Sequence, residues 1–475
     1  MKGIILSSKF IQSDLAFEYG KVLPVELPLN DFPLIKHQID FLEKYCSEII
    51  LIKPKNYTSK IIERYRGNLN IISNEFNSII EAFTFISSLD FDKCFILYGD
   101  TLFDGDLDIA DKNYFFVNST SHYYDWGETY QNQVPSGGMI FQKEKLLKLL
   151  EDSIDFNYFA KKCFIDNSII KFNSLVWYDF GSINTYYESK KYFLKTRTFN
   201  KIIIHNNFLQ KQSNDFFKIW AEFNWFKKLN DLDLINLPQV KLFNLTSSNA
   251  SYYIEYLNLP VLSDIFVFGK YPHEYFFKIL LRVKEDLLKI QSVPVNDRGV
   301  NFMYIKLLER QSSVNDIFER FPNKKQQLEK IYHQNISFFK ENNFKNVLMH
   351  GDFCFSNILF DFKSFTPYLI DPRGFLDRNY GAEIIGPEIY DIVKLAHSYL
   401  CSYDLIIHDD YTNIDSIGSE KFNNQLEEFI ELFNIEKQAL LNGLINLFLT
   451  MLPLHRDNFK RQEAFIEVSL KLASL

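Results

Sequence analysis

Two segments decide the fold of this chain: HGDFCFSNIL at residues 350–359 and LID at residues 369–371. They place a carboxylate at Asp352, an amide at Asn357 and a second carboxylate at Asp371, behind an apolar run. Phosphoryl transfer from a nucleotide uses such a set: one Asp orients the attacking hydroxyl, while an Asn and another Asp hold magnesium ions. In the alternative interpretation, Asp352 and Asn357 only cap turns, and His350 is a hydrogen-bonded core histidine. The order of the whole set favours the catalytic interpretation.

The residues that flank these segments predict short buried strands. Residues 347–349 and 368–370 are apolar runs that are typical of strands. The polar side chains therefore fall at strand ends, which is where a catalytic loop rich in β-structure would hold them.

This pattern resembles the catalytic core of the aminoglycoside phosphotransferases and choline kinases, which are small-molecule kinases with a protein-kinase-like fold. The resemblance implies that Asp352 is the catalytic base and that Asn357 and Asp371 are magnesium ligands. It also implies that Asp391, in the segment YDIVKL at residues 390–395, supports the catalytic loop.

The roles of two further residues, Arg373 and Cys354, stay open. Many relatives carry an aromatic or small residue after the metal-binding Asp, whereas this chain has Pro372 and then Arg373. Arg373 would contact a phosphate or carboxylate of the substrate, for which guanidinium is well suited, or it would form a structural ion pair. Cys354 lies inside the catalytic loop, and the family pattern favours a packing residue over a nucleophile.

The upstream part of such a kinase is also visible. Residues 197–212 contain two strand-like runs around a turn at 205–207, which is typical of a hairpin. Kinases need a strand Lys over the nucleotide phosphates and a helix Glu that positions it. We expect Lys211 and Glu222 in these roles. Glu255 and Leu257, in a hinge at residues 254–257, would offer backbone groups to the adenine; the chain has no GxGxxG loop.

Long amphipathic helices are predicted at residues 271–291, 325–342, 388–400, 422–433 and 436–451. They would build the helical lobe, which sets acceptor specificity in the resembled kinases. Arg310, His455 and Arg456 would bind an anionic or hydroxyl-rich acceptor there. In the alternative interpretation, which the base rates favour, they lie on exposed helix faces.

Composition narrows the class of protein. A chain of 475 residues has room for two or three domains. Its net charge of −8 and its scattered Lys and Arg argue against a nucleic-acid-binding protein. The five cysteines form no CxxC motif, and no apolar run approaches the ~20 residues that span a bilayer. We therefore expect a cytoplasmic protein with no membrane insertion.

The N-terminal part alternates strands and helices. Buried strands are predicted at residues 3–6, 48–52 and 93–98, with helical patterns at 33–42 and 78–83 between them. Such alternation predicts a parallel α/β sheet with a ligand site at the carboxyl ends of its strands. Asp100 follows the third strand, where it would bind a metal ion or merely cap a turn.

The same part is similar to the sugar-phosphate nucleotidyltransferases. The matching segments are residues 1–6, 20–25, 33–38, 98–102 and 177–182. The resemblance implies that Lys21 contacts the sugar phosphate, that Asp100 and Asp179 bind magnesium, and that Gly137 and Gly138 lie on a strand near the sugar.

One part of the family pattern is missing. The relatives have a Gly-rich stretch with an Arg directly after the first strand, whereas this chain reads SSKFIQS at residues 7–13. Glycine permits the close approach of backbone to phosphate, which Phe10 and Ile11 oppose. Lys9 would substitute only as a point charge. An impaired nucleotidyltransferase is therefore expected.

The expected architecture has two domains. Residues 1–192 form a Rossmann-like α/β domain of the GT-A or nucleotidyltransferase type. Residues 193–475 form an α+β protein-kinase-like domain of the aminoglycoside phosphotransferase type. Its small lobe would span about 193–260 and its helical lobe about 261–475.

These expectations describe a kinase that uses ATP and Mg²⁺ to phosphorylate a hydroxyl of a sugar, polyol or amino alcohol. Family analogy points to precursors of capsule or lipopolysaccharide. One alternative is a bifunctional enzyme that uses a second NTP, such as CTP, to make a CDP-activated precursor; another is a non-catalytic scaffold or regulatory protein. Oligomerisation through the N-terminal domain, the acceptor and the choice between ATP and GTP stay open.

Overall fold

The computed structural model describes residues 1–119, 132–193, 201–205, 207–246, 248–297, 299, 301–376, 378, 381 and 383–475. The chain divides into two compact units. Unit 1 comprises Met1–Lys195 with Phe268–Lys270, and unit 2 comprises Thr196–Val267 with Tyr271–Leu475. The expected domain boundary at 192/193 adjoins residues 194–200, which lie outside the described part of the chain, so its position stays a prediction.

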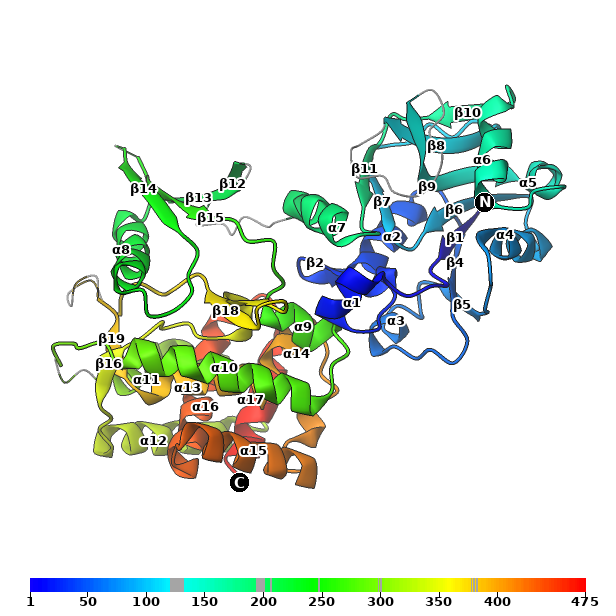
Figure 1. Cartoon of the computed structure of the whole chain (residues 1–475). Coiled ribbons are helices and arrows are strands. Elements are labelled where there is room, and N and C mark those ends of the chain that lie inside the picture. Colours follow the sequence, from blue (N-terminus) through cyan, green and yellow to red (C-terminus); the bar gives the residue numbers. More distant parts are fainter. Residues whose placement is uncertain are drawn as a thin grey trace. The chain divides into compact units, whose positions relative to one another are not determined.

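Unit 1 is built on a mixed sheet (Figure 1). Its strands are β1 (Lys2–Leu6), β4 (Glu48–Lys53), β5 (Asn70–Ser73), β6 (Lys93–Tyr98), β8 (Asn113–Ser119), β9 (Gln133–Gln142) and β10 (Ile169–Phe172). In the described residues the order is β10-β8-β9-β6-β1-β4-β5. The strands β6, β1, β4 and β5 are parallel, as the alternation predicted, but β9 runs antiparallel to both of its neighbours. An antiparallel neighbour needs no crossover helix, so alternation along the sequence does not reveal it.

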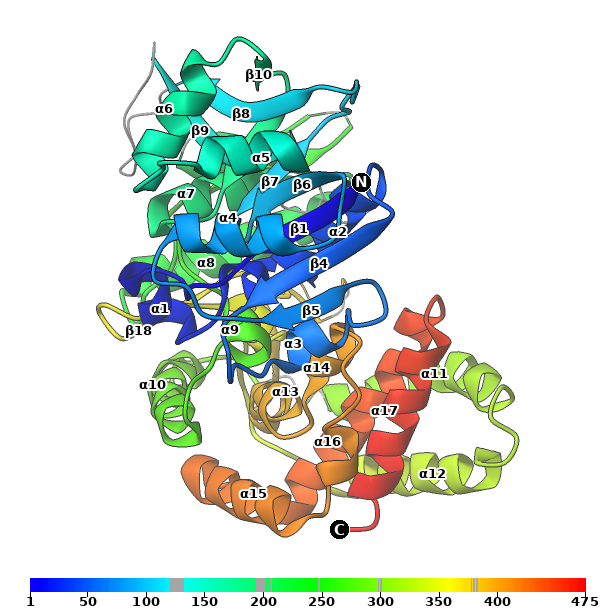
Figure 2. The same cartoon turned by 90° about the vertical axis from the view of Figure 1, so that its right-hand side faces the viewer.

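Helices cover both faces of this sheet. The main ones are α2 (Leu34–Glu43), α4 (Ile79–Ser88), α5 (Lys143–Leu150) and α6 (Phe156–Ile165). Figures 1 and 2 show α4, α5 and α6 on one face and α2 on the other. On the first face, Phe83 packs on Phe159 with ring centroids 5.1 Å apart; on the second, Phe41 packs on Phe95 at 5.9 Å. The three-layer arrangement confirms the α/β class of this part.

Shorter elements complete unit 1. They are α1 (Ser13–Tyr19), β2 (Pro28–Leu29), β3 (Phe32–Pro33), α3 (Lys60–Glu63), β7 (Thr101–Asp104), β11 (Val176–Asp179) and α7 (Ile183–Lys190). Strands β7 and β11 pair antiparallel, and Asp179 is directly opposite Thr101. This pairing brings the two candidate carboxylates of unit 1, Asp100 and Asp179, to the same strand ends.

Unit 2 begins with a small lobe. Its strands are β12 (Lys201–His205), β13 (Phe208–Ser213), β14 (Val240–Leu245) and β15 (Ala250–Glu255), and its helix is α8 (Phe216–Leu232). The described strands form an antiparallel sheet in the order β12-β13-β15-β14. Helix α8 begins after Asp215, whose carboxylate accepts a hydrogen bond from the N–H of Lys218 at 3.1 Å. It packs against β13, β14 and β15.

The second lobe of unit 2 is helical. Its helices are α9 (Leu262–Phe268), α10 (His273–Gln291), α11 (Phe302–Phe318), α12 (Lys325–Glu341), α13 (Ile389–Tyr399), α14 (Tyr403–Ile407), α15 (Glu420–Phe433), α16 (Lys437–Met451) and α17 (Phe459–Leu472). Helix α16 packs against α11, α12, α13 and α17 and is buried almost all round, so it forms the centre of this lobe. Each predicted long helix is present, and the ends differ from the prediction by at most two residues, as at His273 in α10.

Two short antiparallel strand pairs lie in the second lobe of unit 2. Strand β16 (Asn346–Leu348) pairs with β19 (Ile385–Pro387), and β17 (Ile358–Asp361) pairs with β18 (Thr366–Leu369). A small antiparallel sheet followed by a helical lobe confirms the α+β class. In the described part of the chain, no helix combines the length and the apolar character that crossing a bilayer requires.

Candidate active site

The catalytic segment of unit 2 follows β16 and holds Asp352 from two sides. The ammonium of Lys394, on α13, lies 2.7 Å from Asp352 Oδ1. The Asn357 amide donates to Asp352 Oδ2 at 3.0 Å and to the Asp352 backbone carbonyl at 2.9 Å. Burial by itself would raise the pKa of Asp352, but Lys394 outweighs it and holds the pKa well below its ordinary value. Asp352 is therefore an oriented, ionised carboxylate.

Asp391 fixes the backbone that precedes Asp352. Its two carboxylate oxygens accept hydrogen bonds from the N–H groups of His350, at 2.7 Å, and Gly351, at 2.9 Å. Gly351 has φ of +77°, and a Cβ there would lie 2.0 Å from Ile384 Cδ1, so only glycine fits. Burial raises the pKa of Asp391 to about 7. The support that the resemblance implied for Asp391 thus has a direct geometric counterpart.

The His350 ring makes hydrogen bonds to both segments of the site, at Asp352 and at Ile370. Its Nδ1 accepts the N–H of Asp352 at 3.4 Å, so Nε2 carries the proton and donates to the Ile370 carbonyl at 3.0 Å. The ring is fully buried edge-on against Trp225, and burial lowers its pKa to about 4. His350 is therefore neutral and structural, as the alternative interpretation has it.

Asn357 and Asp371 lie at one end of the β17–β18 hairpin. The Ile370 N–H donates to the Asn357 carbonyl at 3.0 Å, and Asp371 follows directly. Because the Asn357 amide nitrogen is held by Asp352, its Oδ1 is left to accept or to bind a cation. Within the described residues, no three His, Cys, Asp or Glu side chains gather to hold a metal unaided. The pair fits Mg²⁺, which prefers oxygen ligands and shares its coordination with nucleotide phosphates.

Lys211 on β13 is bound by two carboxylates. Its Nζ lies 2.7 Å from Glu222 Oε2 on α8 and 3.1 Å from Asp371 Oδ1. The Tyr252 hydroxyl donates to Glu222 at 3.1 Å. Burial would lower the pKa of Lys211, but Asp371 and Glu222 raise it well above its ordinary value. The structure thus brings together the predicted strand Lys, its helix Glu and one predicted metal ligand.

The segment after Asp371 packs tightly on α8. Gly374 has φ of +80°, and a Cβ there would lie 2.7 Å from the backbone nitrogen of Glu222, so this close approach requires glycine. Arg373 donates from its backbone to His350 O at 2.9 Å and from Nε to Phe375 O at 3.2 Å. In the described part of the chain no carboxylate lies within ion-pair distance of Arg373. Among the described residues, Arg373 therefore donates to backbone carbonyls and contacts no carboxylate.

One backbone N–H of the hinge at residues 254–257 makes no hydrogen bond among the described residues. The Glu255 N–H donates to Gln239 O and the Tyr256 N–H to Asn207 O, both at 2.8 Å. Among the described residues the N–H of Leu257 has no such acceptor. Leu257 therefore keeps the backbone donor expected of it, whereas the N–H of Glu255 is already used.

Lys394, which contacts Asp352, is absent from the set of site residues that the sequence predicted. A Lys inside the apolar run of residues 389–396 could have revealed it, because it signals a buried charge. Arg456 is exposed and lies 3.7 Å from Asp316. The His455 ring packs edge-on against Phe465 with centroids 5.0 Å apart, and burial lowers its pKa to about 4. Burial raises the pKa of the Cys354 thiol to about 12, as for an inert packing residue.

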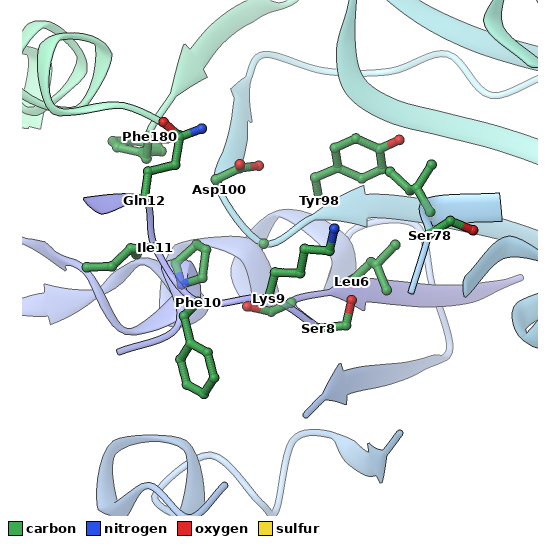
Figure 3. A pocket seen from close by; sticks show the side chains of 15 residues that line it. Leu6, Ser8, Lys9, Phe10, Ile11, Gln12, Ser78, Tyr98, Asp100 and Phe180 are labelled. Carbon is green, nitrogen blue, oxygen red and sulfur yellow. The ribbon is translucent and has the colours of Figure 1, made fainter. Parts of the chain in front are cut away.

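A pocket of about 250 Å³ lies in unit 1 (Figure 3). Lys9, Tyr98 and Asp100 are among its lining residues. The side-chain amide of Gln38 donates to the carbonyls of Tyr98, at 3.0 Å, and Thr101, at 2.7 Å, and so fixes the loop that carries Asp100. Phe10 and Ile11 also line the pocket where the resembled family has glycines.

Asp100 and Asp179 face the same space. A Cβ on Gly181 would meet Asp100 Oδ2 at 3.1 Å and Asp179 Oδ1 at 3.2 Å. Burial and then the nearby Asp179 raise the pKa of Asp100 to about 7, and burial raises that of Asp179. Two close oxygen ligands of this kind fit a divalent cation, which would relieve their repulsion.

Lys21 does not join these carboxylates. Its side chain is exposed, and its ammonium lies 4.4 Å from the centre of the Phe10 ring, outside the set of pocket-lining residues. Gly137 and Gly138 lie in β9; a Cβ on Gly137 would meet Thr101 Oγ1 at 2.5 Å. In the described residues, Lys9 is the cation that lines the pocket.

No protein-family model and no curated protein matches the sequence. The GDP and kanamycin complex of APH(2″)-IIia is 16% identical, with 59% of this chain and 92% of that chain covered and a TM-score of 0.42. The aminoglycoside phosphotransferase APH(3″)-Id from Streptomyces rimosus, with ADP and streptomycin, is 13% identical, with coverages of 56% and 87% and a TM-score of 0.34.

The third structure is a glucose-1-phosphate thymidylyltransferase from Bacillus anthracis in complex with sucrose. It is 13% identical, with 42% of this chain and 96% of that chain covered and a TM-score of 0.31.

Proposed function

We propose that this chain is a small-molecule kinase that transfers a phosphoryl group from ATP to an alcohol hydroxyl. The observation that carries the proposal is the arrangement around Asp352, an ionised carboxylate held by Lys394 and Asn357. Asp371 lies at the same end of the β17–β18 hairpin as Asn357 and is bound to Lys211. Asp352 accepts the proton of the acceptor hydroxyl. Lys211 neutralises charge on the nucleotide phosphates, and the backbone N–H of Leu257 donates a hydrogen bond to the adenine.

Magnesium completes the proposed site. Asn357 Oδ1 and the Asp371 carboxylate would hold it, and the bound ion would neutralise charge on the phosphates. ATP as donor, a cytoplasmic location and a role in precursors of surface polysaccharide belong to this proposal and rest on the resemblance. Asp371 contacts Lys211 in the structure, so we expect Mg²⁺ to compete with this contact when nucleotide binds.

The test is acceptor-dependent release of ADP. The full chain is incubated with ATP, Mg²⁺ and a panel of sugars, polyols and amino alcohols. Asp352→Asn removes the charged acceptor and should lower kcat by about 10³-fold. Asp415→Asn, at a position whose side chain is 95% exposed, is the matched control. The proposal fails if no member of the panel stimulates ADP release, or if Asp352→Asn retains the activity.

A second candidate activity is nucleotidyl transfer in unit 1. The paired carboxylates Asp100 and Asp179 beside a pocket favour it, and Phe10 and Ile11 in place of glycines oppose it. A bifunctional enzyme would release pyrophosphate from CTP or another NTP in the presence of the phosphorylated acceptor. Asp100→Ala would stop that release. If pyrophosphate does not appear with any NTP, unit 1 has another role, such as docking or oligomerisation.

A further inference from the structure

A group of basic side chains lies near Asp352. Phe302, Lys306 and Arg310 follow one another at intervals of four residues on α11, so they lie on one face of this helix. The guanidinium of Arg373 lies 4.8 Å from the centre of the Phe302 ring. Arg373 is thereby placed against the same helix face.

A second contact links this face to Asp352. The ammonium of Lys306 lies 3.4 Å from the hydroxyl of Tyr390 on α13. One turn further along α13, Lys394 binds Asp352 at 2.7 Å. The charges of Arg310, Arg373 and Lys394 all act on Lys306, and Arg310 also donates a hydrogen bond to the Thr450 carbonyl. We call Lys306, Arg310, Arg373 and Lys394 the basic cluster.

The basic cluster lacks matching negative charge. Lys306 is only 6% exposed, and its nearest polar partner is the Tyr390 hydroxyl. In the described ranges, the only carboxylate within ion-pair distance of any of the four cations is Asp352, which binds Lys394. Burial and the neighbouring Arg310, Lys394 and Arg373 lower the pKa of Lys306 well below its ordinary value. This concentration of positive charge occurs in a chain whose net charge is −8.

Burying an ammonium without a carboxylate is unfavourable, and an apolar side chain would cost less at this position. A buried charge of this kind beside a catalytic group indicates a ligand that supplies the missing partner. Lys and Arg side chains only donate hydrogen bonds, so the ligand group must accept them. A cationic acceptor, such as a simple amino alcohol, would be repelled.

We propose that the acceptor of this kinase carries a phosphate or carboxylate group that binds Lys306, Arg310 and Arg373 while its hydroxyl reaches Asp352. This inference rests on the proposed kinase function and narrows its substrate class. The reaction joins the γ-phosphoryl group of ATP to the hydroxyl oxygen, breaks the bond to ADP and releases the hydroxyl proton at Asp352. The acceptor's anionic group takes no part in bond breaking and serves to position the substrate.

The first experiment compares acceptors that differ only in charge. Glycerol, D-glycerate and sn-glycerol 3-phosphate form one set; galactose, galacturonate and galactose 6-phosphate form another. We expect kcat/KM of an anionic member to exceed that of its neutral counterpart at least about tenfold. The carboxylate and phosphate members distinguish the two anion chemistries. A neutral sugar, choline or ethanolamine as the best acceptor would overturn the inference.

Variants then connect the preference to the basic cluster. Lys306→Met keeps a side chain of similar length in the buried position, and it should raise KM for the anionic acceptor about tenfold with a smaller change in kcat. Lys330→Met, at an exposed position on α12, is the control. An unchanged KM in Lys306→Met would count against the inference.

A binding measurement separates this inference from the kinase proposal. Inorganic phosphate is titrated calorimetrically into the full chain while Mg²⁺ and a non-hydrolysable ATP analogue saturate the nucleotide site. Lys306→Met and Arg310→Gln should weaken phosphate binding about tenfold, and Lys330→Met should not. Such binding without ADP release from any acceptor would support the anion site and contradict the kinase. Absent binding, or equal binding in all variants, would contradict the anion site.

Discussion

The two candidate sites of this protein both place carboxylates at strand ends, but their surroundings differ in charge. In unit 2, Asp352 binds Lys394, and Asp371 and Glu222 bind Lys211. In unit 1, among the described residues, neither Asp100 nor Asp179 has a cation within ion-pair distance. A site with paired charges is preorganised for catalysis, whereas a pair of uncompensated carboxylates needs a bound cation first.

Among the variants that remove a buried cation, the largest effect is expected at Lys211. Lys211→Met removes the cation that the proposed mechanism places over the nucleotide phosphates, so we expect kcat/KM for ATP to fall by about 10²-fold. It also removes the nearest cation of the buried Glu222 and leaves only Lys218, 3.9 Å away. This should lower the free energy of unfolding by about 3 kcal/mol. The double variant Lys211→Met with Glu222→Gln should recover part of that stability but none of the activity. Steady-state kinetics and thermal unfolding measure both, with Lys201→Met on β12 as the control.

A second variant tests the ion pair at the catalytic carboxylate. In Lys394→Met the burial of Asp352 is no longer offset, so the pKa of Asp352 should rise. In the proposed mechanism Asp352 acts in its ionised form. The acidic limb of kcat/KM should therefore move to higher pH, and kcat at neutral pH should fall about tenfold. The exposed Lys421 on α15 provides a control in Lys421→Met. An acidic limb at the same pH as in the wild type would show that Lys394 does not set this pKa.

Acidification should destabilise the chain through His350. Burial lowers its pKa from 6.5 to about 4, so the unfolded chain takes up this proton first. The stability due to neutral His350 is complete above pH 6.5 and is lost as the pH falls toward 4, by about 3 kcal/mol in all. His350→Gln should flatten this part of the dependence in denaturant unfolding, and the exposed His333→Gln should leave it unchanged. Parallel curves for all three proteins would refute the assignment.

The smallest effect is expected in unit 1 and has the opposite sign. Asp100→Asn removes one of two buried, neighbouring carboxylates, so at neutral pH it should raise the free energy of unfolding by about 1 kcal/mol. Added Mg²⁺ should stabilise the wild type and not this variant. Asp106→Asn, at a side chain that is 94% exposed, controls for the loss of charge. Destabilisation by Asp100→Asn would show that this carboxylate is a structural acceptor.

Much of the kinase-like site followed from local sequence. Lys211, Glu222, Asp352 and Asn357 were expected in their observed places because each belongs to a strand, helix or loop with a recognisable pattern and order. The antiparallel course of β9 did not follow, since its pairing with β6 depends on residues far apart in the chain. The sequence also did not reveal that the Glu255 N–H makes a hydrogen bond within the protein. Its acceptor, the Gln239 carbonyl, precedes β14 and comes next to Glu255 only when β14 pairs with β15.

By itself, the sequence determined the two fold classes, the ends of the long helices and the set of oxygen ligands near residues 350–371, because hydrophobic periodicity and motif spacing are local properties. The tertiary structure alone decided which charges meet. Lys394 reaches Asp352, Lys306 reaches the Tyr390 hydroxyl, and Arg373 lies against Phe302 only because segments distant in sequence pack together. Charge compensation depends on distances in space, so an unpaired buried cation becomes visible only after folding.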